Sequence, residues 1–428
     1  MEEERPGLEV SAGGGLPETT MDELCTGLCK FMVESGADAG LAQFASLLVG
    51  VLLVSGVPLL TVIILIWVER KVAARIQDRI GPNRVGPLGL MQTFADLLKL
   101  LGKEDITPTS ADRVLYNAAP LVSFASVVLI WVVVPFTPFH FGVDLEIGAL
   151  YFVAIASLGT LAIMTAGWAS NNKYALLGAF RVVALLVSYE VPLVFALLAP
   201  VMLAGSMSML DIVNAQTGMW FVVLSPLAFV IFYISSQAET GRAPFDLIEA
   251  ESELVAGFNI EYSGMKFGMF FAAEFLHVFT NGILMALLFF GGWMGPLYYE
   301  SPLIAFAWLG LKGTIIYLTT LWLRNTVPRL RIDQIMAFNW KFLVPLSIAN
   351  LILLSAALKI LQELGIAPRD MLSAGFVDVL PTTIIMLLIN LVMVAYLLGI
   401  LRRHGQEFRR ASQANQRTLA QAASGAGD

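Results

Sequence analysis

Long apolar runs recur along this 428-residue chain, and they constrain its fold more than any other feature. Most of them hold about 20 residues, the length that a helix needs to cross the ~30 Å hydrocarbon core of a membrane. Charged residues make up only 14 % of the sequence, whereas a typical soluble domain contains about 25 %. Because backbone groups inside a bilayer must bond to one another, helices are the expected spanning element. The sequence therefore predicts an all-α fold, a polytopic bundle of transmembrane helices.

Nine intervals of the sequence are expected to span the membrane. A polar extension at residues 1–40 precedes them, and a polar tail at 405–428, which we expect to be disordered, follows them. No internal repeat is visible, which argues against a transporter built from inverted halves. The predicted spans are 44–68, 115–139, 148–169, 176–204, 219–237, 268–291, 302–323, 342–361 and 376–400.

Positive charge alternates from loop to loop. The loop after the first span and the tail are rich in Lys and Arg, whereas 140–147, 205–218 and 292–301 contain neither residue. Loops rich in Lys and Arg stay on the cytoplasmic side. This distribution predicts an odd number of spans, with the N-terminus outside and the C-terminus in the cytoplasm. It also places the acidic segment 238–266 inside.

The first cytoplasmic loop combines basic residues with residues that break helices. Two Gly-Pro pairs, beginning at Gly81 and Gly86, force a rigid and non-helical path. From Gly89 to Lys103 the apolar residues follow one helical stripe, which predicts an amphipathic helix lying in the membrane interface. Two interpretations of this loop stay open: an anchor for lipid head groups, or a docking surface for a soluble partner.

The segment from Gly241 to Glu261 crowds five carboxylates between two apolar runs. Mutual repulsion raises the pKa of some members of such a group, which makes them candidates for proton exchange near neutral pH. Packing against a bilayer surface gives no reason to gather so many anions. The five residues are Asp246, Glu249, Glu251, Glu253 and Glu261.

Four ionisable residues fall inside the predicted spans: Arg181, Glu190, Glu274 and Lys312. Each costs about 2.5–3.5 kcal/mol to insert. Ion pairs that merely fix helix packing are the structural alternative, but buried pairs often add little net stability. A proton or ion pathway is therefore favoured. Glu274 shares a helical face with His277, which by itself is more typical of a satisfied polar contact between helices than of a ligand.

Composition also excludes several kinds of site. The net charge of −7 gives no indication of nucleic-acid binding. Two cysteines, Cys25 and Cys29, and three histidines are too few for an iron–sulfur cluster or a usual zinc site. We therefore expect no metal and no cofactor in this chain, so any redox group must belong to partner chains.

Several motifs together resemble one family, the quinone-site membrane subunit of respiratory complex I. Its members are the H subunit of bacterial NADH:quinone oxidoreductase and NADH dehydrogenase subunit 1 of mitochondria. Their number and their order along residues 45–350 make the resemblance specific, unlike any single short motif. The segments that carry it are Glu69–Lys71, Gly81–Gly89, Gln92 with Ala95-Asp96, Lys103-Glu104, Gly167–Tyr174, Ser188–Glu190, Gly241–Gly264 and Arg329–Lys341.

The resemblance implies an eight-helix core at residues 41–361 and an additional transmembrane helix at 362–404. It implies that loops and helix ends form part of a chamber that a quinone enters from the bilayer. The residues implied for the chamber or for docking are Glu69, Arg70, Arg79, Arg84 and Asp96. Those implied for proton coupling are Glu190, Asp246, Glu249, Glu251, Glu253, Glu261, Glu274, Lys312 and Arg181.

The implied function is that of a membrane subunit in a proton-translocating NADH:quinone oxidoreductase. Quinone is the implied substrate, and iron–sulfur clusters and flavin are implied in partner subunits. The implied partners are soluble subunits bearing iron–sulfur clusters at the cytoplasmic loops, small and antiporter-like membrane subunits, and membrane lipid. Two alternatives stay open: the related subunit of a membrane-bound hydrogenase or other-donor quinone reductase, and a stand-alone ion-coupled transporter.

The loop charges generate a prediction about topology. In a variant without Cys25 and Cys29, Ser11→Cys should react with an impermeant thiol reagent added to intact cells. Ser252→Cys and Ser412→Cys should react only after the membrane is opened, because both lie in segments assigned to the cytoplasm. Labelling of Ser252→Cys in intact cells would reverse the orientation.

Overall fold

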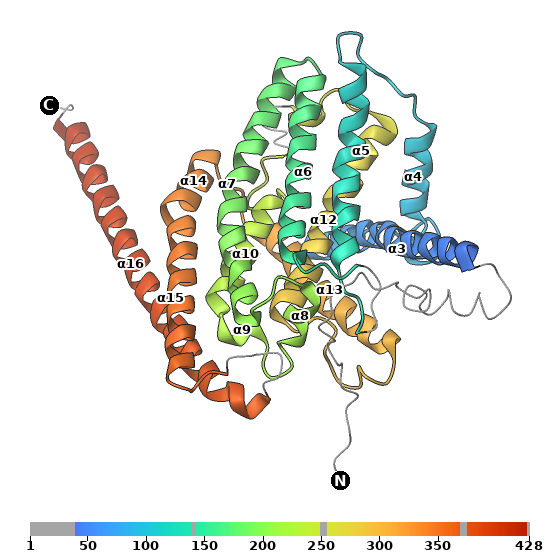
Figure 1. Ribbon diagram of the computed structural model, residues 1–428. Helices are drawn as coiled ribbons and strands as arrows, with labels where there is room; N and C mark the ends of the chain where they lie inside the picture. Colours follow the sequence, from blue (N-terminus) through green and yellow to red (C-terminus); the bar gives the residue numbers. More distant parts are fainter. Residues whose placement is uncertain (1–38, 139–142, 249–254, 369–374, 426–428) are drawn as a thin grey trace. The chain divides into compact units, whose positions relative to one another are not determined.

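The computed structural model describes residues 39–138, 143–248, 255–368 and 375–425. The chain divides into two compact units, Met1–Gly56 and Val57–Asp428. Across the described ranges the secondary structure is helical and includes no strand (Figure 1). Cys25, Cys29, Glu249, Glu251 and Glu253 lie outside the described residues.

The second unit holds all of the bundle except the first part of α3. Short helical turns of other kinds interrupt it at Pro87–Gly89, Trp131–Val133, Gly257–Asn259 and Asn339–Leu343. The α-helices are α3 (Ala39–Ile76), α4 (Gln92–Gly102), α5 (Arg113–Ile130), α6 (Gly148–Ala169), α7 (Lys173–Ala204), α8 (Met209–Asn214), α9 (Phe221–Leu224), α10 (Pro226–Glu239), α12 (Gly264–Phe289), α13 (Pro302–Thr326), α14 (Ile332–Phe338), α15 (Val344–Glu363) and α16 (Phe376–Gly425).

Eight helices in the described part of the chain are long and apolar enough to cross a membrane. They confirm eight of the nine predicted spans and the polytopic helical bundle. The ninth predicted span, 219–237, is not one continuous helix as expected: the interval is divided between α9 and α10, with Ser225 in a non-helical conformation. Pro226 explains the break, since its ring has no N–H and clashes with a preceding carbonyl. The 14 residues of α10 extend only about 21 Å at 1.5 Å per residue.

The expectation of a disordered tail is also wrong, because α16 continues as a helix to Gly425. The physical reason lies in the composition of this segment. Residues 405–425 are rich in Ala, Gln and Arg, which are among the residues most favourable to a helix. The hydrophilic character of the segment predicts exposure to solvent, whereas its side-chain types favour helix formation.

The amphipathic helix predicted in the first loop is present as α4. Its apolar residues Phe94, Leu97, Leu98 and Leu101 are exposed in the isolated chain. Leu100 packs instead against α12: a Cβ added to Gly268 of that helix would lie 2.9 Å from the Leu100 side chain. The helix therefore contacts α12 through Leu100 and presents a separate apolar face.

Helix α12 is the most enclosed of the eight candidate spans, since 78 % of its most apolar stretch is buried, against 22 % for α16. It contacts α5, α10 and α13, while α5, α6 and α7 stand side by side (Figure 1). Small residues permit this packing, as is usual where helices meet in a membrane. Any polar side chain on the inner face of α12 is therefore placed in the interior of the bundle.

A close backbone approach joins α7 to the turn at Gly257–Asn259. A Cβ added to Gly178 would lie 2.7 Å from the carbonyl carbon of Gly257. The obstructing atoms belong to the backbone, so they cannot move aside as a flexible side chain would. The turn carries Phe258 into a core cluster with Val182 and Tyr262.

We predict that Gly178→Ala destabilises the bundle by about 1–3 kcal/mol, the usual cost of overpacking. Thermal unfolding of the purified chain in detergent measures the effect as a lower Tm. Gly310→Ala is the matched control, because a Cβ there meets no atom within 4 Å. Equal Tm values for the two variants would contradict the packing argument.

Candidate functional site

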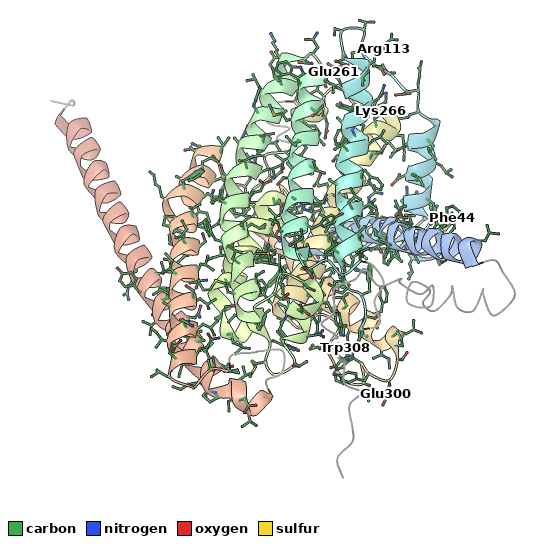
Figure 2. The ribbon with its side chains drawn as sticks, in the orientation of Figure 1. Phe44, Arg113, Glu261, Lys266, Glu300 and Trp308 are labelled. Atoms are coloured by element: carbon green, nitrogen blue, oxygen red, sulfur yellow. The ribbon has the colours of Figure 1, made fainter. Side chains whose placement is uncertain are left out.

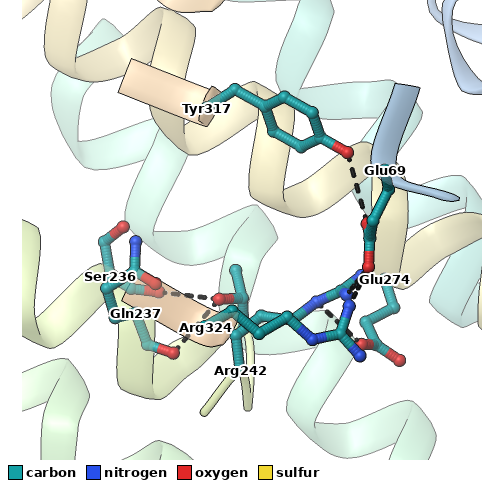
Figure 3. Close-up of polar contacts among 8 residues, drawn as sticks. Glu69, Ser236, Gln237, Arg242, Glu274, Tyr317 and Arg324 are labelled. Atoms are coloured by element: carbon teal, nitrogen blue, oxygen red, sulfur yellow. Dashed lines mark hydrogen bonds and ion pairs between the residues drawn. The ribbon is translucent and has the colours of Figure 1, made fainter. Parts of the chain in front are cut away.

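A cluster of buried charges lies where α3, α12 and α13 meet the loop after α10 (Figure 3). Arg242 Nη1 donates to Glu69 Oε1 at 2.6 Å, and Arg242 Nε lies 3.1 Å from Glu274 Oε1. Arg324 of α13 also pairs with Glu69, and the Tyr317 hydroxyl donates to Glu69 Oε2 at 3.3 Å. We call these five residues the charge cluster. Two carboxylates and two guanidinium groups balance one another within it.

Burial makes this pairing obligatory. Glu69 is 7 % exposed and Arg242 is 2 % exposed. A charge removed from water is tolerated when it is paired, and removal of one partner leaves the other uncompensated. Arg242 is the centre of the arrangement, since its guanidinium reaches carboxylates from two helices and lies 4.6 Å from the centre of the Phe275 ring. The positions of α3 and α12 at this point therefore depend on one cation.

Local structure explains why Arg242 points into the cluster. Helix α10 ends at Glu239, and the next turn is closed by Gly241 at a φ of 61°, a conformation that favours glycine. The Arg242 N–H then donates back to the Gln237 carbonyl at 3.4 Å. Further along, the Pro244 carbonyl accepts from the Leu330 N–H at 3.1 Å, which ties this loop to the segment after α13.

A polar cavity of about 70 Å³ adjoins the charge cluster, between α5, α6, α7, α10 and α12. Glu239, Glu274 and His277 contribute to its lining together with Thr160 and Ser126. A single water molecule needs only about 10–15 Å³ of such space and two to four polar partners. The cavity is therefore large enough and polar enough to hold several water molecules.

Two further carboxylates belong to this region. Glu239 is 7 % exposed, and its Oε2 accepts from Asn281 Nδ2 at 3.5 Å. Glu190 of α7 accepts from Thr160 Oγ1 at 3.3 Å. Arg181 lies half-buried on the same helix as Glu190. The structure thus brings Glu190 and Glu274, predicted from sequence, together with Glu239, which the sequence analysis missed.

The signals for the missed residues were present but weak. Glu239 follows the apolar stretch of α10 directly, so it could be assigned either to the span or to the acidic segment after it. Arg242 and Arg324 sit near span ends, where cations are common. Glu69 lies at the end of an apolar run, so its carboxylate must pair with a cation. That requirement would have pointed to Arg242 and Arg324.

A second group of predicted site residues joins α3 to α4. Arg70 Nη1 donates to Asp96 Oδ2 at 2.5 Å, and Gln92 and Lys99 also lie near this carboxylate. Burial by itself raises the pKa of Asp96, but the hydrogen bond and charge of Arg70, together with Gln92 and Lys99, hold it below its ordinary value. A carboxylate with a depressed pKa stabilises the fold at neutral pH, and that contribution is lost as the pH falls through the depressed value.

The other residues predicted for the loops lie apart from the charge cluster. Arg79 and Arg84 are exposed, and Arg79 Nε donates to Gln77 at 2.7 Å. Glu261 lies toward one end of the bundle (Figure 2), where its Oε1 accepts from Asn172 Nδ2 at 2.7 Å. Asp246 is half-buried in the loop after α10. Exposed cations suit docking, whereas Glu261 fastens the loop to the start of α7.

Lys312 occupies a different environment from the one its charge suggested. Its Nζ donates to the carbonyls of Phe290, Gly292 and Met294 at 2.7, 2.9 and 2.6 Å. The ammonium also lies 4.9 Å from the centre of the Trp220 ring. A lysine has three protons to donate, and carbonyls at a helix C-terminus attract a cation. The contacts are those of a cap on α12, and the coupling role of Lys312 stays a prediction.

Within the described ranges, no group of three or more His, Cys, Asp or Glu residues could hold a metal ion. The site consists instead of paired charges, hydroxyl groups and carboxylates around a polar cavity. Such groups can accept, store and release protons. The fold and the site together define a class: polytopic membrane proteins with paired charges and titratable groups in the interior of the helix bundle.

Comparison with known proteins identifies the family. The chain matches the NADH dehydrogenase family over residues 49–355. It is 50 % identical over 307 residues to the NADH-quinone oxidoreductase H subunit of Dehalococcoides mccartyi, covering 72 % of this chain and 85 % of that protein. The corresponding H subunits of Brevibacillus brevis and Geobacter metallireducens are each 48 % identical, over 67 % of this chain and 86 % and 89 % of their own lengths. The chain belongs to the NADH dehydrogenase family.

We predict that Arg242→Met lowers the stability of the folded chain by about 3–5 kcal/mol, because it leaves buried carboxylates unpaired. The amount of chain in the membrane and its Tm in detergent measure the loss. Arg79→Met is the control for an exposed guanidinium.

A second substitution tests the cause. Glu274→Gln in the Arg242→Met background removes one uncompensated charge, so it should recover part of the lost Tm. If Arg242→Met behaves like Arg79→Met, the cluster does not depend on Arg242.

Proposed function

We propose that this chain is the membrane subunit of a proton-translocating NADH:quinone oxidoreductase. It forms part of the quinone chamber and the start of the charged path that couples quinone reduction to proton pumping. The observation that carries this proposal is the continuity of buried and half-buried ionisable groups: Arg324, Glu69, Arg242 and Glu274 are paired, and Glu274 lines a polar cavity with Glu239. The related proteins reported above are named as subunits of the same enzyme, which favours it over a hydrogenase subunit or a stand-alone transporter.

The chain would act on protons while its partners act on electrons. Reduction of a quinone to a quinol consumes two electrons and two protons. Iron–sulfur clusters and flavin in soluble partner subunits would supply the electrons, and carboxylates of this chain would supply or replace protons. The quinone would enter from the bilayer as substrate, so this chain needs no resident cofactor.

The charge cluster offers a way to pass on the effect of reduction. Arg242 lies between Glu69 and Glu274 and pairs with both. Protonation of Glu69 would remove one of these attractions, so Arg242 would pair more strongly with Glu274. A change at one carboxylate would then alter the proton affinity of the next. Repetition of this step along Glu239 and Glu190 would carry the signal through the bundle.

The loops supply the surfaces that such a subunit needs. The exposed residues Arg79 and Arg84 suit docking of a soluble partner. The exposed apolar residues of α4, such as Leu98 and Leu101, suit the membrane interface. We place the chain in the bacterial cytoplasmic membrane, with its N-terminus outside and these loops inside, on the distribution of Lys and Arg. Small and antiporter-like membrane subunits would continue the charged path.

We predict that Glu69→Gln lowers NADH-driven quinone reduction at least tenfold, because an amide keeps the shape of the carboxyl but cannot exchange its proton. Membrane vesicles that contain the assembled complex are used for the assay. NADH oxidation by a soluble artificial acceptor should persist, since it needs only the soluble partners. Glu363→Gln is the control, as Glu363 is an exposed carboxylate paired with Lys359 at 3.2 Å.

Assembly is checked by mass spectrometry of the gently solubilised complex, which should contain this chain with quinone-reductase partners. Recovery with a nickel-bearing subunit instead would refute the proposed function. Undiminished quinone reduction in an assembled Glu69→Gln complex would also refute the role of the charge cluster.

A further inference from the structure

His277 occupies an unusual position in the polar cavity. It lies on α12 one turn after Glu274, and its Nε2 is 3.8 Å from Glu239 Oε1. In the described part of the chain this buried Nε2 has no hydrogen-bond partner. Buried polar atoms are nearly always bonded, so an exception needs an explanation such as a catalytic role or a bound water molecule.

The same face of α12 carries three polar side chains in succession. Glu274, His277 and Asn281 are spaced i, i+3 and i+7, which places them on one helical stripe. Glu274 pairs with Arg242 at one end, and Asn281 donates to Glu239 at the other. His277 is therefore the titratable group between the charge cluster and Glu239.

The walls of the cavity determine which groups can exchange protons with the imidazole. The polar groups that line the cavity from α5 are the hydroxyls of Ser123 and Ser126, and the one from α6 is the hydroxyl of Thr160. The Thr160 hydroxyl donates to the Glu190 carboxylate of α7. The charged and titratable groups that surround His277 are Glu239 from α10, Glu274 from α12 itself, Glu190 reached through Thr160, and Arg242 paired with Glu274.

We propose that His277 is a proton carrier that connects Glu274 to Glu239. This inference rests on the proposed function and names a residue for it. The imidazole has two nitrogens, one of which bears a proton in the neutral ring while the other accepts one. The ring can therefore receive a proton on one side and release another proton on the other side.

The transfer balances without any oxidant or reductant. The O–H bond of a protonated Glu274 breaks, water in the cavity relays that proton, and an N–H bond forms at Nδ1. The Nε2–H bond breaks, and an O–H bond forms at Glu239 Oε1. One proton has moved between two carboxyl groups, and the imidazole is left as the other tautomer. Proton exchange through the cavity water, from Nδ1 to Nε2, restores the starting tautomer.

The test uses His277→Gln in membrane vesicles that contain the assembled complex. An amide can form hydrogen bonds but cannot carry a proton, so NADH-driven proton uptake into the vesicles should fall at least tenfold. NADH oxidation by a soluble artificial acceptor, measured on washed vesicles, should stay unchanged, which shows that the soluble partners remain attached to the membrane. Leu276→Met is the matched control, because Leu276 is a buried neighbour on α12 and the exchange conserves volume.

Chemical rescue separates proton transfer from packing. In His277→Ala vesicles, added imidazole should restore proton uptake by at least fivefold in a dose-dependent way. Pyrazole, a ring of the same size and much weaker basicity, should not. Equal rescue by both compounds, or by neither, would assign His277 a structural role and overturn the proposal.

The outcome is distinguishable from failure of the proposed function. Suppose that Glu69→Gln is inactive while His277→Gln takes up protons within twofold of the unsubstituted complex. That result overturns only the role of His277. Full quinone reduction by Glu69→Gln overturns the function itself. If His277→Gln lowers NADH oxidation by the soluble acceptor, assembly is disturbed. The rescue experiment with His277→Ala then decides between proton transfer and a structural role.

Discussion

The pairing of Arg242 with two carboxylates is the interaction on which the rest of the site depends. Arg242 joins Glu69 of α3 to Glu274 of α12, and Arg324 of α13 completes the balance of charge. Because Glu69 and Arg242 are almost fully buried, bulk water cannot compensate a charge whose partner has moved. The helices that carry these residues are therefore fixed relative to one another by electrostatics as well as by packing. The same requirement makes the cluster responsive, since a change of protonation at one carboxylate changes the pairing of the next.

The polar side chains along the middle of α12 and those around its C-terminal end have different surroundings. Along the middle of the helix, Glu274 and His277 line a cavity and lie close to Arg242 and Glu239, and Asn281 donates to Glu239. At the C-terminal end, Lys312 and Trp220 close the helix through carbonyl and ring contacts. The cavity with several titratable groups suits proton exchange, whereas the carbonyl cradle around a single ammonium suits a fixed structural contact.

Small residues make the polar interior possible. The approach of Gly178 to Gly257 brings the last part of the acidic loop, Gly241–Glu261, against α7. Phe258 and Tyr262 then pack with Tyr116, whose ring stacks on that of Tyr262 with their centres 4.2 Å apart. This apolar cluster and the charge cluster hold the acidic loop from its two ends. The function that we propose therefore depends on packing and electrostatics acting on the same loop.

The sequence by itself determined the class of the protein and most of its helices, because an apolar run of membrane-spanning length is a local property. It also indicated Glu190 and Glu274, since ionisable residues inside apolar runs are conspicuous, and the family resemblance pointed to Glu69. Only the tertiary structure decided their partners. Glu69 is separated from Arg242 by 173 positions and from Arg324 by 255, so helix crossings alone bring them together. The same holds for Glu239 and His277, whose approach depends on how α10 and α12 pack, and for Lys312, whose charge gave no sign that it would cap a helix.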